Sequence, residues 1–415
     1  MAGDHLNFLI KLLYSMRILF VSPAYPPIKN AIGEYVRWLA LELSKNNHEV
    51  AILTINSNHR CDDVKFRNRD LDLEHIKYED NRIDIFPCVK NWKIDFQNYL
   101  IKVRAYYKPD VISLQYEPYS YASKGLPFFL VKSFKNIFYQ EITITFHEVY
   151  ARDYLWGNKF YYILYFLQTK IAKKLCQLSF VCFTALDLYM KVFQNDKIKK
   201  LYVGSNIQAE VIQGSQQSSF FESEKIFKLV SFGIKNYDII LQSLKLVKNK
   251  THIPFEYHIV GDLPTAVIKK VVQNIETLQI NENVWIHGFM EADEISKLFS
   301  QSHLFIDNNY VDNHKRGGTT LKSGSVAAAF QYGLPVLGYK GDMTDGILNH
   351  KKNIWFCNSS TPAEISQEIQ FLMHKPDLLF NLHLGSNELY NTYLSWPAIA
   401  KTFTAILSER IKENC

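Results

Sequence analysis

Cysteine is scarce in this sequence, and its spacing carries no metal-binding pattern. The 415 residues include six cysteines, and no two of them stand in Cys-x-x-Cys spacing or near a matching cluster of histidines. We therefore expect free thiols in a reducing cytoplasm and no structural zinc site.

Long apolar runs are also missing. No segment reaches about 18 apolar residues without a charge, so we expect no transmembrane helix. The first apolar stretch, Phe8–Leu13, is interrupted by Lys11 and has neither a basic leader nor a small-residue cleavage site, which argues against a signal peptide. Met16 directly precedes a strong strand pattern, so we expect the fold to begin there, after an amphipathic leader or at the native start.

Charge of one sign is only in slight excess. The formal net charge of +6 would suit phosphate-bearing ligands or an anionic membrane surface, but it selects neither. The apolar share of 47% and the charged share of 21% are typical of a globular protein in water. Because 415 residues exceed what one hydrophobic core usually serves, we expect two domains.

Strand and helix patterns alternate along the chain. Residues 17–21 form a continuous apolar run, typical of a strand buried on both faces. Apolar residues then recur at helical spacing from Ile32 to Leu43, and a second strand pattern follows at residues 50–54. This alternation predicts a doubly wound α/β domain over residues 16–205.

A polar segment divides the alternation in two. Gln208–Glu224 is rich in Ser and Gln and predicts a linker. Strands and helices then alternate again, which predicts a second Rossmann-like domain over residues 225–390. Residues 391–415 contain an amphipathic helix pattern, and by analogy with two-domain α/β proteins we expect this helix to pack back toward the first domain.

Two loops of the first half carry candidate ligand-binding residues, because ligands of such domains bind where strands end and helices begin. A Pro-rich loop leads into a helix near Ala31 and Gly33, where amides could hold an anion or sugar hydroxyls. His147 directly follows a predicted buried strand. An ordinary connecting loop and a structural histidine are the alternatives.

The second half has two further loops of this kind. Gly233 ends a strand, and a glycine lets a ligand approach the backbone closely. Lys235 soon follows and supplies a point charge suited to phosphate. The last loop, "RGGTTLKSGSV", joins two cations to a helix start and contains Arg316, Lys322, Ser323, Gly324 and Ser325. We expect its helix to present amides to a diphosphate and to end at Gly333; a flexible loop before a core helix is the alternative.

The ordered set of segments resembles one protein family. Residues 16–54, "TFHEVY", "IVGD" and "GLPVLG" occur in the order seen in GT-B-fold nucleotide-sugar glycosyltransferases of family four. The resemblance covers nearly the whole chain from Met16. It implies two Rossmann-like domains that face a central cleft, and transfer of a sugar from a UDP- or GDP-sugar with retention of configuration and without a cofactor.

The same resemblance implies roles for the candidate residues. His147, Lys235 and Lys322 would be catalytic, and Gly288 and Phe289 would hold the base. The other donor-binding residues would be Ala31, Gly33, Gly233, Arg316, Ser323, Gly324 and Ser325. The leaving diphosphate would take the proton of the acceptor, so no metal is expected; the Asp-x-Asp sequence at Asp70–Asp72 lies in a charged loop of the first half and is discounted.

The sequence departs from the family pattern in three places. The usual Gly-Gly before the first helix is Asn30-Ala31, and the Arg that commonly follows the Gly of the "FG" motif is Ile234. The Glu-x7-Glu motif is absent, since Thr320 and Ala328 stand near its places. The helix start "KSGS" resembles a branch of the family with Arg/Lys-x-Gly-Ser/Thr, which implies that another device holds the ribose.

The resemblance also implies an acceptor bound by the N-terminal domain. We expect a glycan or lipid-linked acceptor, in surface polysaccharide or glycolipid synthesis, and no nucleic-acid partner. Residues 126–140 and 158–177 mix aromatic side chains with Lys, as interfacial helices do. A cytoplasmic protein that contacts the inner face of the membrane is one interpretation, and amphipathic core helices with a solvated basic face are the other.

Three other functions are weighed against transfer. A catalytically silent nucleotide-binding partner subunit and a GT-B-fold epimerase-like enzyme stay open as alternatives. A nicotinamide-dependent dehydrogenase fits less well, because no Gly-x-Gly-x-x-Gly follows the first predicted strand.

Overall fold

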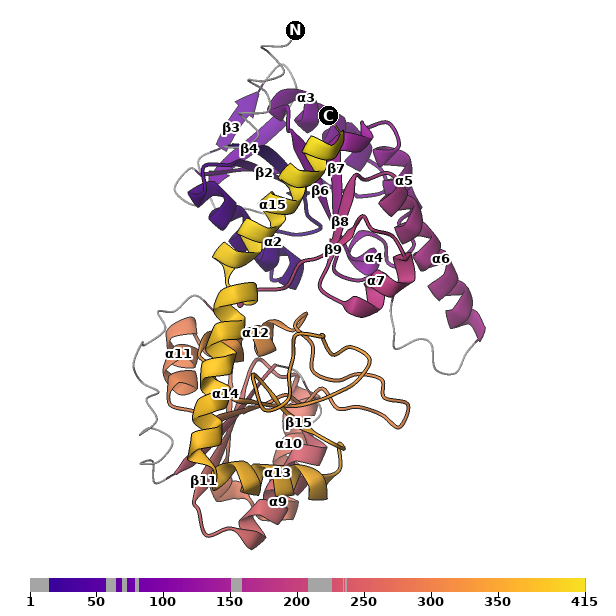
Figure 1. Ribbon diagram of the computed structural model, residues 1–415. Helices are drawn as coiled ribbons and strands as arrows, with labels where there is room; N and C mark the ends of the chain where they lie inside the picture. The colour runs from indigo at the N-terminus through magenta and orange to yellow at the C-terminus, as the bar shows by residue number, and fades with distance from the viewer. Residues whose placement is uncertain are drawn as a thin grey trace. The chain divides into compact units, whose positions relative to one another are not determined.

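The computed structural model describes residues 15–56, 65–68, 73–78, 82–150, 159–207, 226–233, 235 and 237–414. The chain forms two units (Figure 1). Unit 1 comprises residues 1–185, 189–201 and 399–415, and unit 2 comprises residues 186–188 and 202–398. The predicted linker Gln208–Glu224, Ile234 and Asp70–Asp72 lie outside the described residues.

Unit 1 is built on a sheet with the strand order β3-β4-β5-β2-β1-β6-β7-β8-β9. Among the described strands of this sheet, only the pairs β3–β4 and β4–β5 are antiparallel. The strands are β1 (Arg17–Val21), β2 (Glu49–Ile55), β3 (Lys65–Asn68), β4 (Leu73–Tyr78), β5 (Ile83–Val89), β6 (Val111–Tyr116), β7 (Ile142–Phe146), β8 (Val181–Thr184) and β9 (Ile198–Lys200). The helices are α2 (Ala31–Lys45), α3 (Phe96–Tyr107), α4 (Pro118–Tyr121), α5 (Phe128–Phe134), α6 (Lys159–Gln177) and α7 (Asp187–Phe193), with a 3-10 turn at Tyr139–Glu141.

The central strand β1 shows why the apolar run forms a strand here. Its residues from Ile18 to Val21 have no exposed surface, as expected for a parallel strand covered on both faces. The last helix, α15 (Trp396–Asn414), belongs to unit 1 from Ile399 onward. Its Phe403 ring lies 6.1 Å from the Phe20 ring and 5.0 Å from the Phe183 ring, so this helix completes the core of unit 1.

Unit 2 contains a parallel sheet with the strand order β12-β11-β10-β13-β14-β15. The strands are β10 (Phe227–Phe232), β11 (Phe255–Val260), β12 (Val284–Gly288), β13 (Leu304–Ile306), β14 (Val336–Tyr339) and β15 (Trp355–Cys357). The helices are α9 (Asp238–Lys250), α10 (Thr265–Leu278), α11 (Ala292–Ser300), α12 (Gly324–Gln331), α13 (Pro362–Met373) and α14 (Pro376–Leu389), with a 3-10 turn at Asn281–Asn283 and a π turn at Tyr390–Leu394.

Different helices cover the two faces of this second sheet. Apolar residues of α9, α10 and α13 form one core, and those of α11 and α12 form the other. Helices on both faces of a parallel sheet define a doubly wound domain. The expected fold class of two parallel-sheet α/β domains is therefore confirmed.

Strand order in unit 2 creates a topological switch point. The chain runs from β10 outward through β11 to β12 and then returns to β13, on the other side of β10. The loops that follow β10 and β13 therefore diverge, and ligands of open parallel sheets bind beyond the carboxyl ends of strands at such points.

The helix expected between Ser323 and Gly333 is present as α12, which is buried from Val326 to Phe330. Gly333 has φ of +64°, and the Leu334 amide donates to the Ala329 carbonyl over 2.9 Å. This is the hydrogen bond of a Schellman ending, which explains why a glycine followed by Pro335 terminates the helix.

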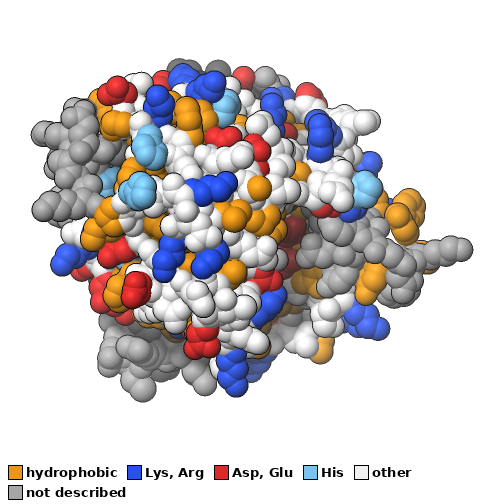
Figure 2. Space-filling view, turned by 90° about the horizontal axis from the view of Figure 1, so that it is seen from below, with side chains coloured by type: hydrophobic (Ala, Val, Ile, Leu, Met, Phe, Trp, Pro, Cys, Tyr) orange, Lys and Arg blue, Asp and Glu red, His pale blue; other side chains and the backbone are white. Residues whose placement is uncertain are grey.

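One face of the molecule mixes charges of both signs. On the face in Figure 2, Lys and Arg side chains are interspersed with Asp and Glu, and apolar side chains lie scattered among them. Scattered apolar side chains are normal on a protein surface. None of the helices in the described part of the chain is long and apolar enough to cross a membrane.

Candidate functional site

A pocket of about 460 Å³ lies in unit 2, at the carboxyl ends of β10, β11 and β12. Its floor is apolar and includes Val260 and Ile295, both buried. The Phe289 ring, 63% exposed, lies at its wall and offers a flat apolar face. A concave apolar site with few polar groups suits a planar organic ring.

Two glycines leave the backbone around this pocket open. Gly233 has φ of +97° and Gly288 has φ of +68°, a region that favours glycine. At neither position does any atom lie within 4 Å of where a Cβ would stand. A ligand can therefore approach the main chain closely beside Phe289 and at the end of β10.

The amino end of α12 borders the same pocket. Gly324 and Ser325 line it, and a Cβ on Gly324 would also meet open space. The N-cap residue Ser323 makes no side-chain capping bond, because its Oγ lies 2.9 Å from the Ser325 Oγ instead. Helix-end amides without a capping side chain, at the positive end of a helix dipole, are suited to an anion.

Lys235 connects the two loops of the switch point. Its ammonium donates a hydrogen bond to Asn309 Oδ1 over 2.8 Å. Asp307, at the end of β13, is 1% exposed, and burial raises the pKa of its carboxyl while the nearby Lys235 charge opposes that rise. The Asp307 Oδ2 atom has no hydrogen-bond partner among the described residues.

A buried polar network supports this crevice and was not expected from the sequence. Tyr257 donates to the Ser231 Oγ over 2.8 Å, and the Asn308 amide nitrogen lies 3.3 Å from the Tyr257 hydroxyl. The polar run Asp307–Asn309 directly after the apolar strand in "LFIDNN" is the signal that could have identified these residues. Buried polar groups satisfied in this way fix the shape of a site.

Three predicted cations lie outside the lining of this pocket: Lys235, Arg316 and Lys322. Arg316 is paired with Asp312 at 2.5 Å, and its guanidinium lowers the pKa of that carboxyl to about 2. Lys322 follows Leu321, whose amide donates to the buried Asp345 over 2.8 Å. The roles predicted for Arg316 and Lys322 therefore stay predictions.

The predicted residues of unit 1 form a separate arrangement. Asn30 caps α2, and its Oδ1 accepts from the amides of Ile32 at 2.9 Å and Gly33 at 3.1 Å. A Cβ on Gly33 would lie 3.0 Å from the Ala24 carbonyl oxygen, so close packing also requires glycine there. A ligand at Ala31 and Gly33 would have to displace the Asn30 cap.

His147 follows β7 and is half-buried. Its Nε2 lies 3.0 Å from Gln115 Oε1, which can only accept, so the imidazole donates from Nε2. The Tyr35 ring packs edge-on against the imidazole at 4.9 Å, and burial raises the pKa of Tyr35. The neighbouring Glu148 accepts a hydrogen bond from Tyr189 at 2.5 Å. These contacts fix the orientation of the His147 ring.

The pocket lies in a segment that resembles a known protein family. Residues 216–383 match the family model of glycosyl transferases group 1. The segment is therefore similar to group 1 glycosyl transferases. It contains every pocket residue named above, from Gly233 to Ser325. A sequence comparison with curated proteins finds no match for the chain.

Solved glycosyltransferases share the fold of the whole chain. The sucrose-phosphate synthase of Thermosynechococcus elongatus has 12% identity and a TM-score of 0.70, with 96% of this chain and 100% of that chain covered. A Rickettsia africae glycosyltransferase has 14% identity and a TM-score of 0.65, with 96% and 99% covered. Anabaena HepE in complex with UDP-glucose has 12% identity and a TM-score of 0.63, with 95% and 100% covered. These likenesses show a GT-B fold.

The described residues contain no group of three or more His, Cys, Asp or Glu side chains that could hold a metal ion. The thiols of Cys176, Cys182 and Cys357 are buried and not in disulfides, and Cys88 is also buried. Hydrogen-bond donors and a helix end, rather than a cluster of metal ligands, are therefore what the described part of the pocket offers to a phosphate.

Proposed function

We propose that the protein is a retaining glycosyltransferase that moves a sugar from a UDP- or GDP-sugar to a glycan or lipid-linked acceptor, in surface polysaccharide or glycolipid synthesis. The observation that carries the proposal is the apolar pocket beside the uncapped amino end of α12, inside the segment that matches the group 1 family model. The complex of Anabaena HepE with UDP-glucose supports a nucleotide-sugar donor.

The two parts of a nucleotide sugar match two parts of this site. The base would pack on Phe289 over the apolar floor, close to the open backbone at Gly288. The diphosphate would lie at the amides of Gly324 and Ser325, with the Lys235 ammonium near the phosphates. These donors act where negative charge develops as the diphosphate leaves.

Asp262 is our candidate for holding the ribose. Thr320 and Ala328, which stand near the places where the family has glutamates, are both buried, and Ala328 is part of the core on the buried side of α12. Asp262 follows β11, is exposed and lines the pocket. A carboxylate after the second strand of a Rossmann-like domain is a standard partner of ribose hydroxyls.

The proposed reaction needs no protein base. The acceptor oxygen bonds to the anomeric carbon on the face from which the diphosphate oxygen departs, and that oxygen takes the acceptor proton. Lys235 and the α12 amides offset the charge on the leaving group.

The test is a panel of nucleotides and nucleotide sugars. The shift in melting temperature reports binding to the native protein, and release of the nucleotide in the presence of acceptor extracts reports transfer. We expect one uridine or guanosine nucleotide sugar to stabilise the protein and to turn over. The sugar in the product should keep the anomeric configuration that it had in the donor. Failure of every nucleotide to stabilise the protein would overturn the proposal, and stabilisation without turnover would favour a silent partner subunit.

We also propose peripheral contact of α6 with an anionic lipid surface. The side chains of Tyr162, Ile163 and Phe166 are 57%, 59% and 62% exposed. Figure 1 shows the amino-terminal end of α6 extending beyond α5. Lys173 and Lys174 are exposed farther along this helix. Aromatic and basic side chains on one helix suit the boundary between acyl chains and headgroups.

A further inference from the structure

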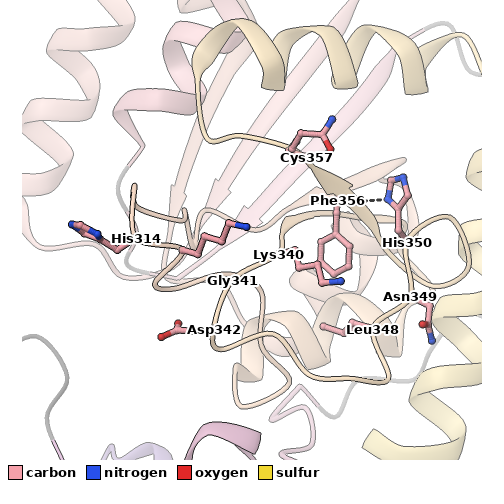
Figure 3. A pocket seen from close by; sticks show the side chains of 11 residues that line it. His314, Lys340, Gly341, Asp342, Leu348, Asn349, His350, Phe356 and Cys357 are labelled. Carbon is pink, nitrogen blue, oxygen red and sulfur yellow. Dashed lines mark hydrogen bonds between the residues drawn. The ribbon is translucent and has the colours of Figure 1, made fainter.

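A second pocket, of about 700 Å³, lies in unit 2 at the carboxyl ends of β14 and β15 (Figure 3). It lies on the other side of the switch point from the donor pocket, which borders β10, β11 and β12. The two pockets share no lining residue. The polar side chains that matter here come from three loops: Lys315, Lys340, Asn349, His350 and Asn358.

The two lysines stand on loops that hold each other in place. The Asp342 amide donates to the Lys315 carbonyl over 2.9 Å, and the Gly317 amide donates to Asp342 Oδ1 over 2.9 Å. A Cβ on Gly341 would lie 2.4 Å from the Gly317 carbonyl oxygen, so the loops also pack backbone to backbone. The Asp342 carboxylate, the acidic group of the lining, is thus engaged in joining the loops.

His350 presents a fixed hydrogen-bond donor. The Phe356 amide donates to its Nδ1 over 3.0 Å, as Figure 3 shows. The proton of the neutral imidazole is therefore on Nε2. The ring also lies 4.6 Å from that of Trp355, which limits its rotation. Burial lowers the pKa of His350, with Lys351 adding to the effect, so the neutral donor form predominates at neutral pH.

The rest of the lining suits an organic group rather than a bare ion. Leu348 and Phe356 are buried and form an apolar surface. The amide nitrogens of Asn349 and Asn358 donate to the Ile347 carbonyl and to Glu364 Oε1, both over 3.1 Å, which orients these exposed side chains. An amide has two N–H donors and an acceptor oxygen, so each side chain can still bond to a hydroxyl. The volume is also within the range of small-molecule sites, about 300–1,000 Å³. A phosphate alone would leave most of this space to water.

We propose that this pocket binds a phosphate monoester of a sugar or another polyol. The phosphate would lie between the ammonium groups of Lys315 and Lys340. Charge-assisted hydrogen bonds from these groups are stronger than those from the neutral side chains of the lining. The polyol would pack on Phe356 and hydrogen-bond to Asn358. The site is separate from the donor pocket and does not depend on the function proposed for it.

The test is calorimetric titration of the full chain with glucose 6-phosphate, glucose and inorganic phosphate. We expect glucose 6-phosphate to bind, glucose not to bind, and inorganic phosphate to bind at least about tenfold more weakly. The double variant Lys315→Gln/Lys340→Gln should weaken glucose 6-phosphate binding about tenfold or more. The matched variant Lys250→Gln/Lys269→Gln removes the same charge from exposed positions of α9 and α10 and should bind as the wild type does.

Three outcomes would overturn the proposal. Equal weakening in both double variants would show an effect of net charge alone. Equal binding of inorganic phosphate would leave the polyol part without a role. Loss of glucose 6-phosphate binding when the donor nucleotide is saturating would place the phosphate in the donor pocket. If no nucleotide binds at all, the proposal of a nucleotide-sugar donor fails. The comparison of the Lys315→Gln/Lys340→Gln and Lys250→Gln/Lys269→Gln variants still tests the sugar-phosphate site.

Discussion

Lys235 and Asn309 join the two loops of the switch point, with the lysine ammonium 2.8 Å from the Asn309 Oδ1 atom. Lys235 follows β10 and Asn309 follows β13. The buried Asp307 lies close enough to Lys235 for the lysine charge to lower the pKa of its carboxyl, against the larger effect of burial. The lysine is therefore held in position by groups from a different loop before any ligand arrives. Such preorganisation is what a site that stabilises a leaving diphosphate requires.

Replacing Lys235 tests this arrangement directly. Lys235→Gln should lower kcat/KM for transfer by about 10- to 100-fold, because one charged donor to the departing diphosphate is lost. Asn309→Ala should have a smaller effect of the same kind, since the lysine keeps its charge and loses only its orientation. Steady-state kinetics with Lys269→Gln as the control would decide, and an unchanged kcat/KM in Lys235→Gln would remove the residue from the site.

Gly324→Ala separates ligand binding from folding. A Cβ at Gly324 meets no atom within 4 Å, so the variant should fold with an unchanged melting temperature. The methyl group would nevertheless stand at the edge of the donor pocket and weaken nucleotide binding, by about tenfold if one amide contact is lost. Gly346→Ala is the matched control, because its Cβ also meets open space away from the pocket. Equal nucleotide affinity in both variants would contradict a diphosphate at this helix end.

Asp262→Asn tests the ribose assignment. We expect about tenfold weaker binding of the nucleotide that stabilises the wild type, because a hydrogen bond to a charged carboxylate becomes a neutral one. The corresponding 2′,3′-dideoxynucleotide should bind the wild type and the variant equally. Asp293→Asn, on α11 outside the lining, serves as the control. An equal loss with both nucleotides would show that Asp262 acts on something other than ribose.

Asp307→Asn should stabilise the protein at neutral pH. Burial raises the pKa of the Asp307 carboxyl above its usual 3.8. At a pH between 3.8 and this raised pKa, the folded protein keeps a proton that the unfolded chain has released. The unfolding free energy therefore falls as pH rises through this window. Asn carries no charge, so the variant should be more stable than the wild type at pH 7, and the difference should shrink as pH falls toward 3.8.

Asp312→Asn should change the stability of the protein at pH 7 in the opposite direction. The pKa of Asp312 is lowered to about 2 by Arg316, so its charge stabilises the fold above its usual pKa and that stability is lost as pH falls toward 2. The variant should accordingly be less stable than the wild type at pH 7. Urea denaturation at pH 7 and pH 4.5 measures both variants, and a less stable Asp307→Asn at pH 7 would show that the buried carboxylate is favourable.

The exposed aromatic side chains of α6 should mediate vesicle binding. Tyr162→Ser/Phe166→Ser should reduce sedimentation with phosphatidylcholine–phosphatidylglycerol vesicles several-fold, because apolar area at the interface is lost. Binding should also weaken with added salt, since lysines contribute to it. Val272→Ser/Leu384→Ser removes exposed apolar side chains of unit 2 and should leave binding unchanged. Wild-type protein that stays in the supernatant would rule out the membrane proposal.

Much of the fold could be predicted because its signals are local. The apolar run of β1 and the helical spacing of α2 reflect short-range periodicity, which the structure confirms. The ending of α12 at Gly333 follows from the conformational freedom of one glycine and the missing amide of Pro335. Gly233, Gly324 and Ser325 were predicted from their positions between strands and helices, and Phe289 from the family resemblance. All four line one pocket.

Contacts between distant segments could not be predicted in the same way. The Asn30 cap on Gly33 was not predicted, although its signal is local, since Asn is a favoured N-cap residue. The burial of Asp307 and its proximity to Lys235 depend on β10 and β13 being neighbours, which only the strand order decides. The ion pair of Arg316 with Asp312 likewise depends on the turn between them.

The amino-acid sequence by itself determined the alternation of strands and helices, the division into two α/β domains and the start and end of α12, because each depends on periodicity or on the chemistry of neighbouring residues. Tertiary structure alone decided that Asp262 borders the pocket beside α12 and that Lys315 and Lys340 share a second one. The reason is that side chains from separate loops meet only after long-range packing has ordered the strands of the sheet.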